Sequence, residues 1–186
     1  MRVLGIDPGS ERTGYGCVES SGSRHRMIAS GVVRVTAGAP LADRLLQIHQ
    51  GLTALLREHQ PACVAIESIF HARHARSALV LGHARGVAML TAAEVGVPIH
   101  EYAPTAIKRA VVGFGRADKA QVQHMVSLLL GLDAVPTPFD ASDALAAAIC
   151  HLHAVPSTAM AAVLPPAGSQ RRTRSAASWR HFRPER

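Results

Sequence analysis

The chain has 186 residues, a formal net charge of +7 and 48% hydrophobic side chains, which suits one compact domain with a sizeable core. Aromatic residues make up 4%, too few to expect the stacking platform of a single-strand binder. A charge at Asp7 leaves no room for a secretory signal, and no apolar run approaches the roughly 18 residues of a membrane helix. We therefore expect a soluble, cytoplasmic protein with no membrane partner.

The positive charge lies in two segments. Residues 73–119 carry a net charge of +4, and residues 155–186 carry +5 from six Arg and one Glu. Basic clusters bind polyanions by releasing counterions from phosphates, so a nucleic acid is the natural partner. A solvated basic surface is the alternative explanation of the charge.

The three cysteines are Cys17, Cys63 and Cys150, an odd count without C-x-x-C spacing. This pattern favours reduced thiols over a disulfide framework or a zinc site. The groups His71/His74 and Cys150/His151/His153 also lack complete zinc-ligand spacing.

The first third of the chain predicts three strands and a helix. An apolar run at residues 3–6 ends at the turn Asp7-Pro8-Gly9, and residues 14–18 and 27–35 continue as strands. We expect them to pair as an antiparallel start of the sheet. Pro40 then opens a helix whose leucines recur at helical spacing up to Pro61.

The remainder predicts a second buried strand and then mostly helices. The strand at residues 63–66 ends at Glu67. The later elements are a helix, a short strand and three helices, over residues 73–95, 97–99, 104–113, 118–131 and 140–153. This order indicates an α/β fold with a mixed sheet. We expect a domain over residues 1–154 and a basic, disordered tail over residues 155–186.

Four carboxylates are placed where they could meet. Asp7 and Glu67 end apolar strands, where open α/β sheets bind ligands, and Asp140 and Asp143 are three residues apart on one helix face. Two carboxylates about 5 Å apart repel by roughly 3 kcal/mol at an effective dielectric near 20, so four would need a hard cation such as Mg²⁺. Taken singly, each has another explanation, as a turn residue, a strand exit, an N-cap or a first-turn acid.

Several segments, in family order, resemble the RuvC family over roughly residues 1–154. They are GIDPGS (5–10) with TGYG (13–16), AIE (65–67) with Phe70, SAL (77–79) and LGHARG (81–86), VVG (111–113) with Lys119 and QVQHMV (121–126), and DASDALA (140–146). Two features depart from the family, Ser68 in place of a common Gln and the basic stretch His71–Arg76.

The resemblance implies a ribonuclease-H-like fold with a mixed five-stranded sheet flanked by helices. It also implies a homodimeric endonuclease of the bacterial cytosol that resolves four-way (Holliday) DNA junctions by paired, symmetric hydrolysis in recombination and repair. Branch-migration proteins of the RuvA and RuvB type would be its partners.

The resemblance further implies which residues do this. The catalytic and metal-binding acids would be Asp7, Glu67, Asp140 and Asp143, holding two Mg²⁺ ions per subunit, with Mn²⁺ as a substitute. In this hypothesis Asp7 bridges the two metals. The DNA-binding residues would be Phe70, which stacks on opened bases, and Arg73, Arg76, Lys108 and Lys119.

Three other functions stay open at this point. A nuclease of the same fold could act on RNA–DNA hybrids or flaps, and a non-catalytic module could bind junctions with structural acids. An actin-like phosphotransferase also begins with a strand–Asp–turn hairpin, but such proteins normally need a second domain. In addition, Ala78, Gly82 and Gly86 form a small-residue stripe that either packs on the sheet or forms a dimer seam.

Overall fold

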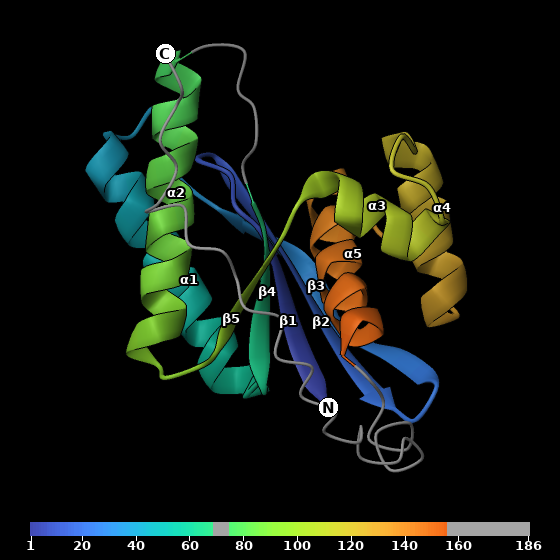
Figure 1. Ribbon diagram of the computed structural model, residues 1–186. Helices are drawn as coiled ribbons and strands as arrows, with labels where there is room; N and C mark the ends of the chain where they lie inside the picture. Colours follow the sequence, from blue (N-terminus) through green and yellow to red (C-terminus); the bar gives the residue numbers. More distant parts are fainter. Residues whose placement is uncertain (69–74, 156–186) are drawn as a thin grey trace, which may run out of the picture. The chain divides into compact units, whose positions relative to one another are not determined.

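The computed structural model describes residues 1–68 and 75–155. Met1–Val155 forms one unit by its internal contacts. Helices cover both faces of a five-stranded sheet within it (Figure 1). The predicted tail over residues 155–186 lies outside the described residues except for Val155, and so do the predicted DNA contacts Phe70 and Arg73. In the part of the chain that is described, no helix is both long and apolar enough to cross a bilayer.

The sheet has the strand order β3-β2-β1-β4-β5. The strands are β1 (Arg2–Asp7), β2 (Arg12–Ser21), β3 (Arg24–Arg34), β4 (Cys63–Glu67) and β5 (Ile99–Tyr102). The first three pair antiparallel, while β1 pairs parallel with β4 and β4 parallel with β5. The predicted mixed five-stranded sheet with an antiparallel start is therefore confirmed.

The described residues form five helices, which are α1 (Leu41–His59), α2 (Ala75–Glu94), α3 (Pro104–Val112), α4 (Lys119–Leu130) and α5 (Phe139–Ala154). The predicted start of α4 is confirmed by a capping box: the Asp118 carboxylate accepts the Gln121 N–H, and the Gln121 side chain accepts the Asp118 N–H. Gly131, in the left-handed conformation, ends this helix as predicted.

One predicted boundary was wrong, and so was the alternative reading of Asp140 as an N-cap. The last strand begins at Ile99 rather than residue 97, because the Val97 N–H bonds to the Ala92 carbonyl in the turn that ends α2. The strand then continues through polar His100, since it lies at the sheet edge and only β4 pairs with it. The final helix begins at Phe139, so Asp140 lies inside its first turn and is not an N-cap.

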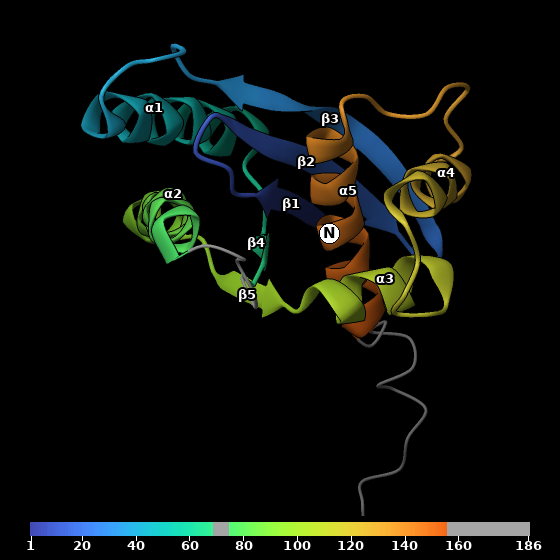
Figure 2. The ribbon, with the colours of Figure 1, turned by 90° about the horizontal axis from the view of Figure 1, so that it is seen from above.

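The core lies in two layers because strand side chains alternate between the faces of the sheet. Leu4 and Ile6 of β1 face α1 and α2, whereas Val3 faces α3, α4 and α5. Figure 2, seen from above, shows α1 and α2 on one face of the sheet and α5 on the other.

Glycines let α5 approach β1 and β2 at backbone distance. A Cβ added at Gly5 would lie 1.8 Å from the Ala144 carbonyl oxygen, and one added at Gly14 would lie 2.0 Å from the Asp140 carbonyl oxygen. No side chain fits in those gaps. The alanine-rich, buried face of α5 completes this close packing and places the start of α5 beside the end of β1.

Candidate active site

Two acids come from neighbouring strand ends. Asp7 ends β1 and Glu67 ends β4, and these strands are parallel with Ile6 opposite Ile66. The loop after Asp7 is held by Thr13, whose hydroxyl donates to the Gly9 carbonyl at 2.9 Å. A Cβ at Gly9 would lie 2.1 Å from the Arg12 carbonyl oxygen, so this turn needs glycine. The tight turn fixes the direction in which Asp7 leaves the sheet.

The second pair of acids comes from the beginning of α5. Asp143 is 18% exposed and accepts a hydrogen bond from Lys119 Nζ at 2.9 Å. Lys119 is the first residue of α4, so its cation lies at the end of that helix where the helix dipole disfavours it. The Asp143 carboxylate offsets that disadvantage. Asp140 lies one helical turn before Asp143 and is partly buried.

These side chains meet at a cavity of about 440 Å³. Its lining includes three of the four predicted acids and two predicted lysines, namely Asp7, Glu67, Asp143, Lys108 and Lys119. Asp140 is not in the lining, but its charge acts on Asp7. The four acids therefore lie at one end of the sheet, with Asp140 beside the cavity rather than in its wall.

Burial and like charge together disfavour the ionised carboxylates of the cavity. Burial, followed by the charges of Glu67, Asp143 and Asp140, raises the pKa of Asp7 to about 8, although Lys119 opposes this. Burial and the charge of Asp143 also raise the pKa of Glu67. The hydrogen bond to Asp143 raises the pKa of Lys119. The two lysines do not neutralise the acids, so the cavity favours a further cation.

The donor set indicates which cation would fit. The acids present only carboxylate oxygens, which suit hard ions such as Mg²⁺ or Mn²⁺ rather than thiophilic ones. A bound divalent ion would also return the pKa of Asp7 toward its ordinary range, because an opposite charge favours the ionised form. The residues present therefore fit a divalent metal site.

The predicted DNA-binding residues fall into three groups. Lys108 and Lys119 line the cavity. Arg76 is exposed in the first turn of α2 and does not line it. Phe70 and Arg73 are outside the described residues, so their placement stays a prediction.

A second pocket escaped the sequence analysis. It has a volume of about 250 Å³ and is lined by Arg12, Arg34 and Arg44, with Glu11 the acidic residue in its wall. Arg44 also donates to the Ser10 carbonyl at 3.3 Å, so the pocket adjoins the turn that follows Asp7. These arginines come from three separate elements, and a count of charge along local segments gives no sign of them.

Comparisons with known proteins show the family of the chain. The family model described as "Crossover junction endodeoxyribonuclease RuvC" matches residues 3–151. The protein of that name from Koribacter versatilis is 55% identical over 154 residues, which is 82% of this chain and 93% of the relative. The one from Alkalilimnicola ehrlichii is 54% identical over 152 residues, covering 82% and 91%.

Solved structures give the same result. The structure of T. thermophilus RuvC in complex with a Holliday junction substrate is 35% identical, with a TM-score of 0.78 over 83% of this chain and 94% of that one. The yeast mitochondrial Holliday junction resolvase Ydc2 is 14% identical with a TM-score of 0.60, a likeness of fold alone. The predicted ribonuclease-H-like fold is confirmed.

Proposed function

The chain belongs to the RuvC family of crossover junction endodeoxyribonucleases, and on that premise we propose that its acidic cavity holds two Mg²⁺ ions that serve the cleavage of Holliday junctions. Members of this family are metal-dependent nucleases that resolve four-way DNA. The observation that carries the proposal is the gathering of Asp7, Glu67 and Asp143 at one cavity with the pKa of Asp7 raised to about 8.

Each acid has a place in this proposal. Asp7 would be the shared ligand, because β1, which it ends, pairs with the Glu67 strand and packs under the helix that carries Asp140 and Asp143. Glu67 and the Asp140/Asp143 pair would hold the ions from the strand side and from the helix side. When bound, a pair of divalent ions activates the attacking water and stabilises the attacking and leaving oxygens. Mn²⁺ has the same preference for oxygen ligands and would substitute.

Basic residues around the cavity would position the DNA. Lys119 and Lys108 line the cavity and would contact the backbone near the phosphate that is cut. The pocket of Arg12, Arg34 and Arg44 beside the Asp7 turn would hold a second backbone phosphate. Phe70, Arg73 and Arg76 keep their predicted roles in contacting opened bases and backbone.

The decisive experiment compares a synthetic four-way junction with linear duplex and RNA–DNA hybrid, with Mg²⁺ and with chelator. The wild type should make paired symmetric nicks in the junction alone, and chelator should abolish them. Asp7→Asn should slow cleavage by at least about 100-fold, since even indirect changes at metal sites cost about 10–100-fold.

Asp43→Asn is the matched control, because Asp43 is exposed on α1 and loses the same charge away from the cavity. It should cut at the wild-type rate. An Asp7→Asn protein that cuts at full rate would refute the metal assignment. Tight junction binding without cutting under any metal would instead favour the non-catalytic module.

Symmetric nicking also calls for two active sites, and α2 offers a surface for a homodimer. Gly82 and Gly86 have nothing within 4 Å of an added Cβ, so these two stripe residues do not pack on the sheet. Leu79 and Leu90 on the same helix are 66% and 56% exposed. We propose that a second copy covers this face through a two-fold contact.

Gly82→Glu should convert the dimer to a monomer, as measured by light scattering coupled to gel filtration, and should abolish paired nicking. Ala54→Glu is the control, because it places the same charge on the exposed face of α1. If Gly82→Glu leaves the mass of the dimer unchanged, the seam lies elsewhere. Partners of the RuvA and RuvB type and a cytoplasmic location stay predictions.

A further inference from the structure

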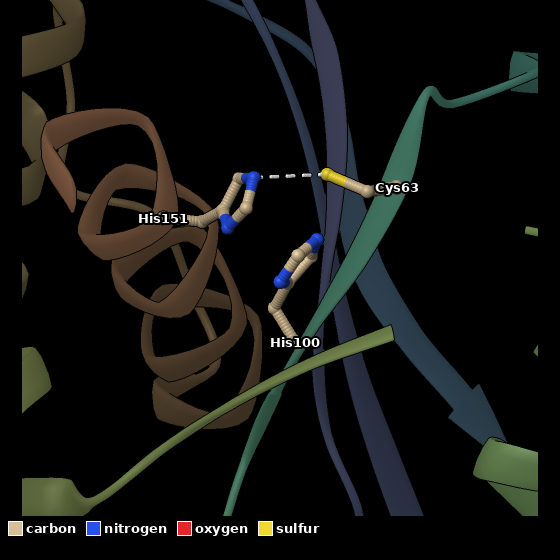
Figure 3. Close-up of side chains that lie close together, drawn as sticks. All are labelled: Cys63, His100 and His151. Carbon is tan, nitrogen blue, oxygen red and sulfur yellow. Dashed lines mark hydrogen bonds between the residues drawn. The ribbon is translucent and has the colours of Figure 1, made fainter. Parts of the chain in front are cut away.

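A second cluster of metal-ligating side chains lies away from the acids. Cys63 and His151 are buried, His100 is exposed, and one ligand atom from each lies within 4.8 Å of the others. Figure 3 shows the three side chains turned toward one another from β4, β5 and α5. We propose that this cluster is a binding site for Zn²⁺, held by one thiolate, two imidazoles and a water.

The fold places the three residues on one face. Cys63 and Ala65 of β4 both belong to the core layer under α5. His100 is opposite Ala65 in the parallel pair, so its side chain faces the same way. His151 lies in the last turn of α5, and its ring centroid lies 4.3 Å from that of His100.

The distances are close to what zinc requires. Cys63 Sγ and His151 Nε2 are 3.1 Å apart. In a tetrahedral site with Zn–S near 2.3 Å and Zn–N near 2.0–2.1 Å, these atoms would be about 3.6 Å apart. To admit the ion, Cys63 Sγ and His151 Nε2 therefore need to move apart by about half an ångström. Small rotations of the two side chains can provide this. His100 is exposed, so solvent would supply a water as the fourth ligand.

The second shell suits the same ion. Tyr102 Oη lies 2.7 Å from His151 Nδ1. In the tautomer with Nδ1 protonated, Nδ1–H donates to Tyr102 and the Nε2 lone pair faces Cys63. A metal ion at Nε2 requires this tautomer, and zinc-bound histidines commonly donate their other N–H in this way. Binding would release the Cys63 thiol proton to solvent, leaving a thiolate on the ion.

This site is separate from the acidic cavity in place and in chemistry. Cys63 and Glu67 are four residues apart on β4, about 13 Å at roughly 3.3 Å per residue. Asp143 and His151 are eight residues apart on α5, about 12 Å at 1.5 Å per residue. Sulfur and nitrogen donors select Zn²⁺, whereas the acids select Mg²⁺. A Zn²⁺ ion here would tie the end of α5 to β4 and β5.

Cobalt is the probe that reports the ligands directly. The full chain, treated with chelator and kept reduced, is titrated with Co²⁺ in excess Mg²⁺, which occupies the acids. We expect one Co²⁺ per chain with tetrahedral visible bands and a thiolate-to-cobalt charge-transfer band in the near ultraviolet. Zn²⁺ should displace it and raise the Tm by several degrees.

Variants test each ligand. Cys63→Ser should lose the charge-transfer band and the Zn²⁺-dependent rise in Tm, whereas Cys150→Ser, the adjacent buried thiol on α5, should keep both. His100→Asn should weaken Co²⁺ binding by at least about tenfold, and His83→Asn, an exposed histidine of α2, should not. Because His100 is exposed, its variant should fold even where Cys63→Ser does not.

Two results would overturn the proposal. The first is a wild-type protein that shows no charge-transfer band at saturating Co²⁺. The second is a band that survives in Cys63→Ser, which would assign the thiolate elsewhere. Junction cleavage in Mg²⁺ is expected to be the same in the wild type and in His100→Asn. A failure of the zinc proposal therefore leaves the nuclease assignment untouched.

Discussion

The two ends of α5 differ in whether their polar side chains are stabilised within the protein. At its beginning, Asp140 and Asp143 lie near Asp7, and burial together with the like charges of Glu67, Asp143 and Asp140 raises the pKa of Asp7 to about 8. At its end, His151 hydrogen-bonds to both Cys63 and Tyr102, so its ring is satisfied within the protein. The clustered acids destabilise the fold until a cation binds, whereas the ring nitrogens of His151 already have hydrogen-bond partners.

This difference shows that the acidic end of α5 lowers the stability of the metal-free fold, and we connect that loss with ligand binding. Folded proteins are stable by only about 5–15 kcal/mol, so concentrated like charge is kept only where a ligand relieves it. The Cys–His end gives no such sign in the folded chain, because its hydrogen bonds already satisfy the buried groups. Geometry, rather than electrostatic conflict, indicates its ligand.

The largest effect is expected from Gly14→Ala, which breaks the acidic end through the backbone. The new Cβ would lie 2.0 Å from the Asp140 carbonyl oxygen, so the start of α5 must move away from β2. We expect a loss of about 1–3 kcal/mol in unfolding free energy. Junction cleavage should fall by at least about 100-fold, since displacements near 1 Å can cost that much.

Denaturant unfolding and single-turnover cleavage measure the two quantities. Gly115→Ala is the control, because a Cβ there would have its nearest contact at 3.4 Å, from the Thr105 carbonyl oxygen. Equal rates for Gly14→Ala and wild type would mean that the acids tolerate a shift of α5.

An effect of intermediate size is expected from Asp7→Asn on the stability of the metal-free protein. The raised pKa of Asp7 means that its contribution to stability is full below about pH 4 and is lost as the pH rises toward about 8. Asp7→Asn removes that loss. In chelator near pH 8 the variant should be more stable by at least about 1 kcal/mol, or roughly 2–4 °C in Tm.

Thermal unfolding in chelator across this pH range tests the sign, because the two Tm values should converge at low pH. Added Mg²⁺ should stabilise the wild type more than the variant. At the other end of α5, Tyr102→Phe should lower the Tm instead, because it removes a hydrogen bond to His151. A metal-free Asp7→Asn protein less stable than wild type near pH 8 would contradict the comparison.

The smallest effect on stability is expected from Lys119→Gln. The Lys119 side chain is 62% exposed, and exposed ion pairs contribute only about 0–1 kcal/mol. Cleavage should nevertheless fall by about 100-fold, the usual loss when one positioned electrostatic group is removed. Lys108→Gln gives a second cavity lysine for comparison. Unchanged cleavage in Lys119→Gln would make the lysine only a partner of Asp143.

The sequence predicted the parts of the acidic site that depend on local pattern. Asp7 and Glu67 follow apolar strands, and the Asp140/Asp143 spacing is helical, so each local setting is readable. The four acids meet because β1 pairs parallel with β4 and because α5 packs closely against Gly5 and Gly14. Local patterns do not encode those contacts. The expectation that the four acids form one site came from the family resemblance.

The parts that escaped prediction depend on contacts between distant segments. Cys63, His100 and His151 stand on three elements with no shared motif, and grouping residues by proximity in sequence paired His151 with Cys150 instead. Arg12 and Arg44 likewise meet only after α1 packs near the opening hairpin. The extent of β5 was misjudged because apolar Val97 lies in the turn that ends α2, whereas the edge strand itself continues through polar His100 and Glu101.

The order of the elements has a consequence for biosynthesis. Asp7 is synthesised before Asp143, which lies on the last helix of the described unit. The four strands β2 to β5 and the four helices α1 to α4 therefore have time to form before Asp143 emerges. Until α5 settles on Gly5 and Gly14, the nascent chain has half of its acids and no assembled cavity. We therefore expect a chain truncated before α5 to leave DNA uncut.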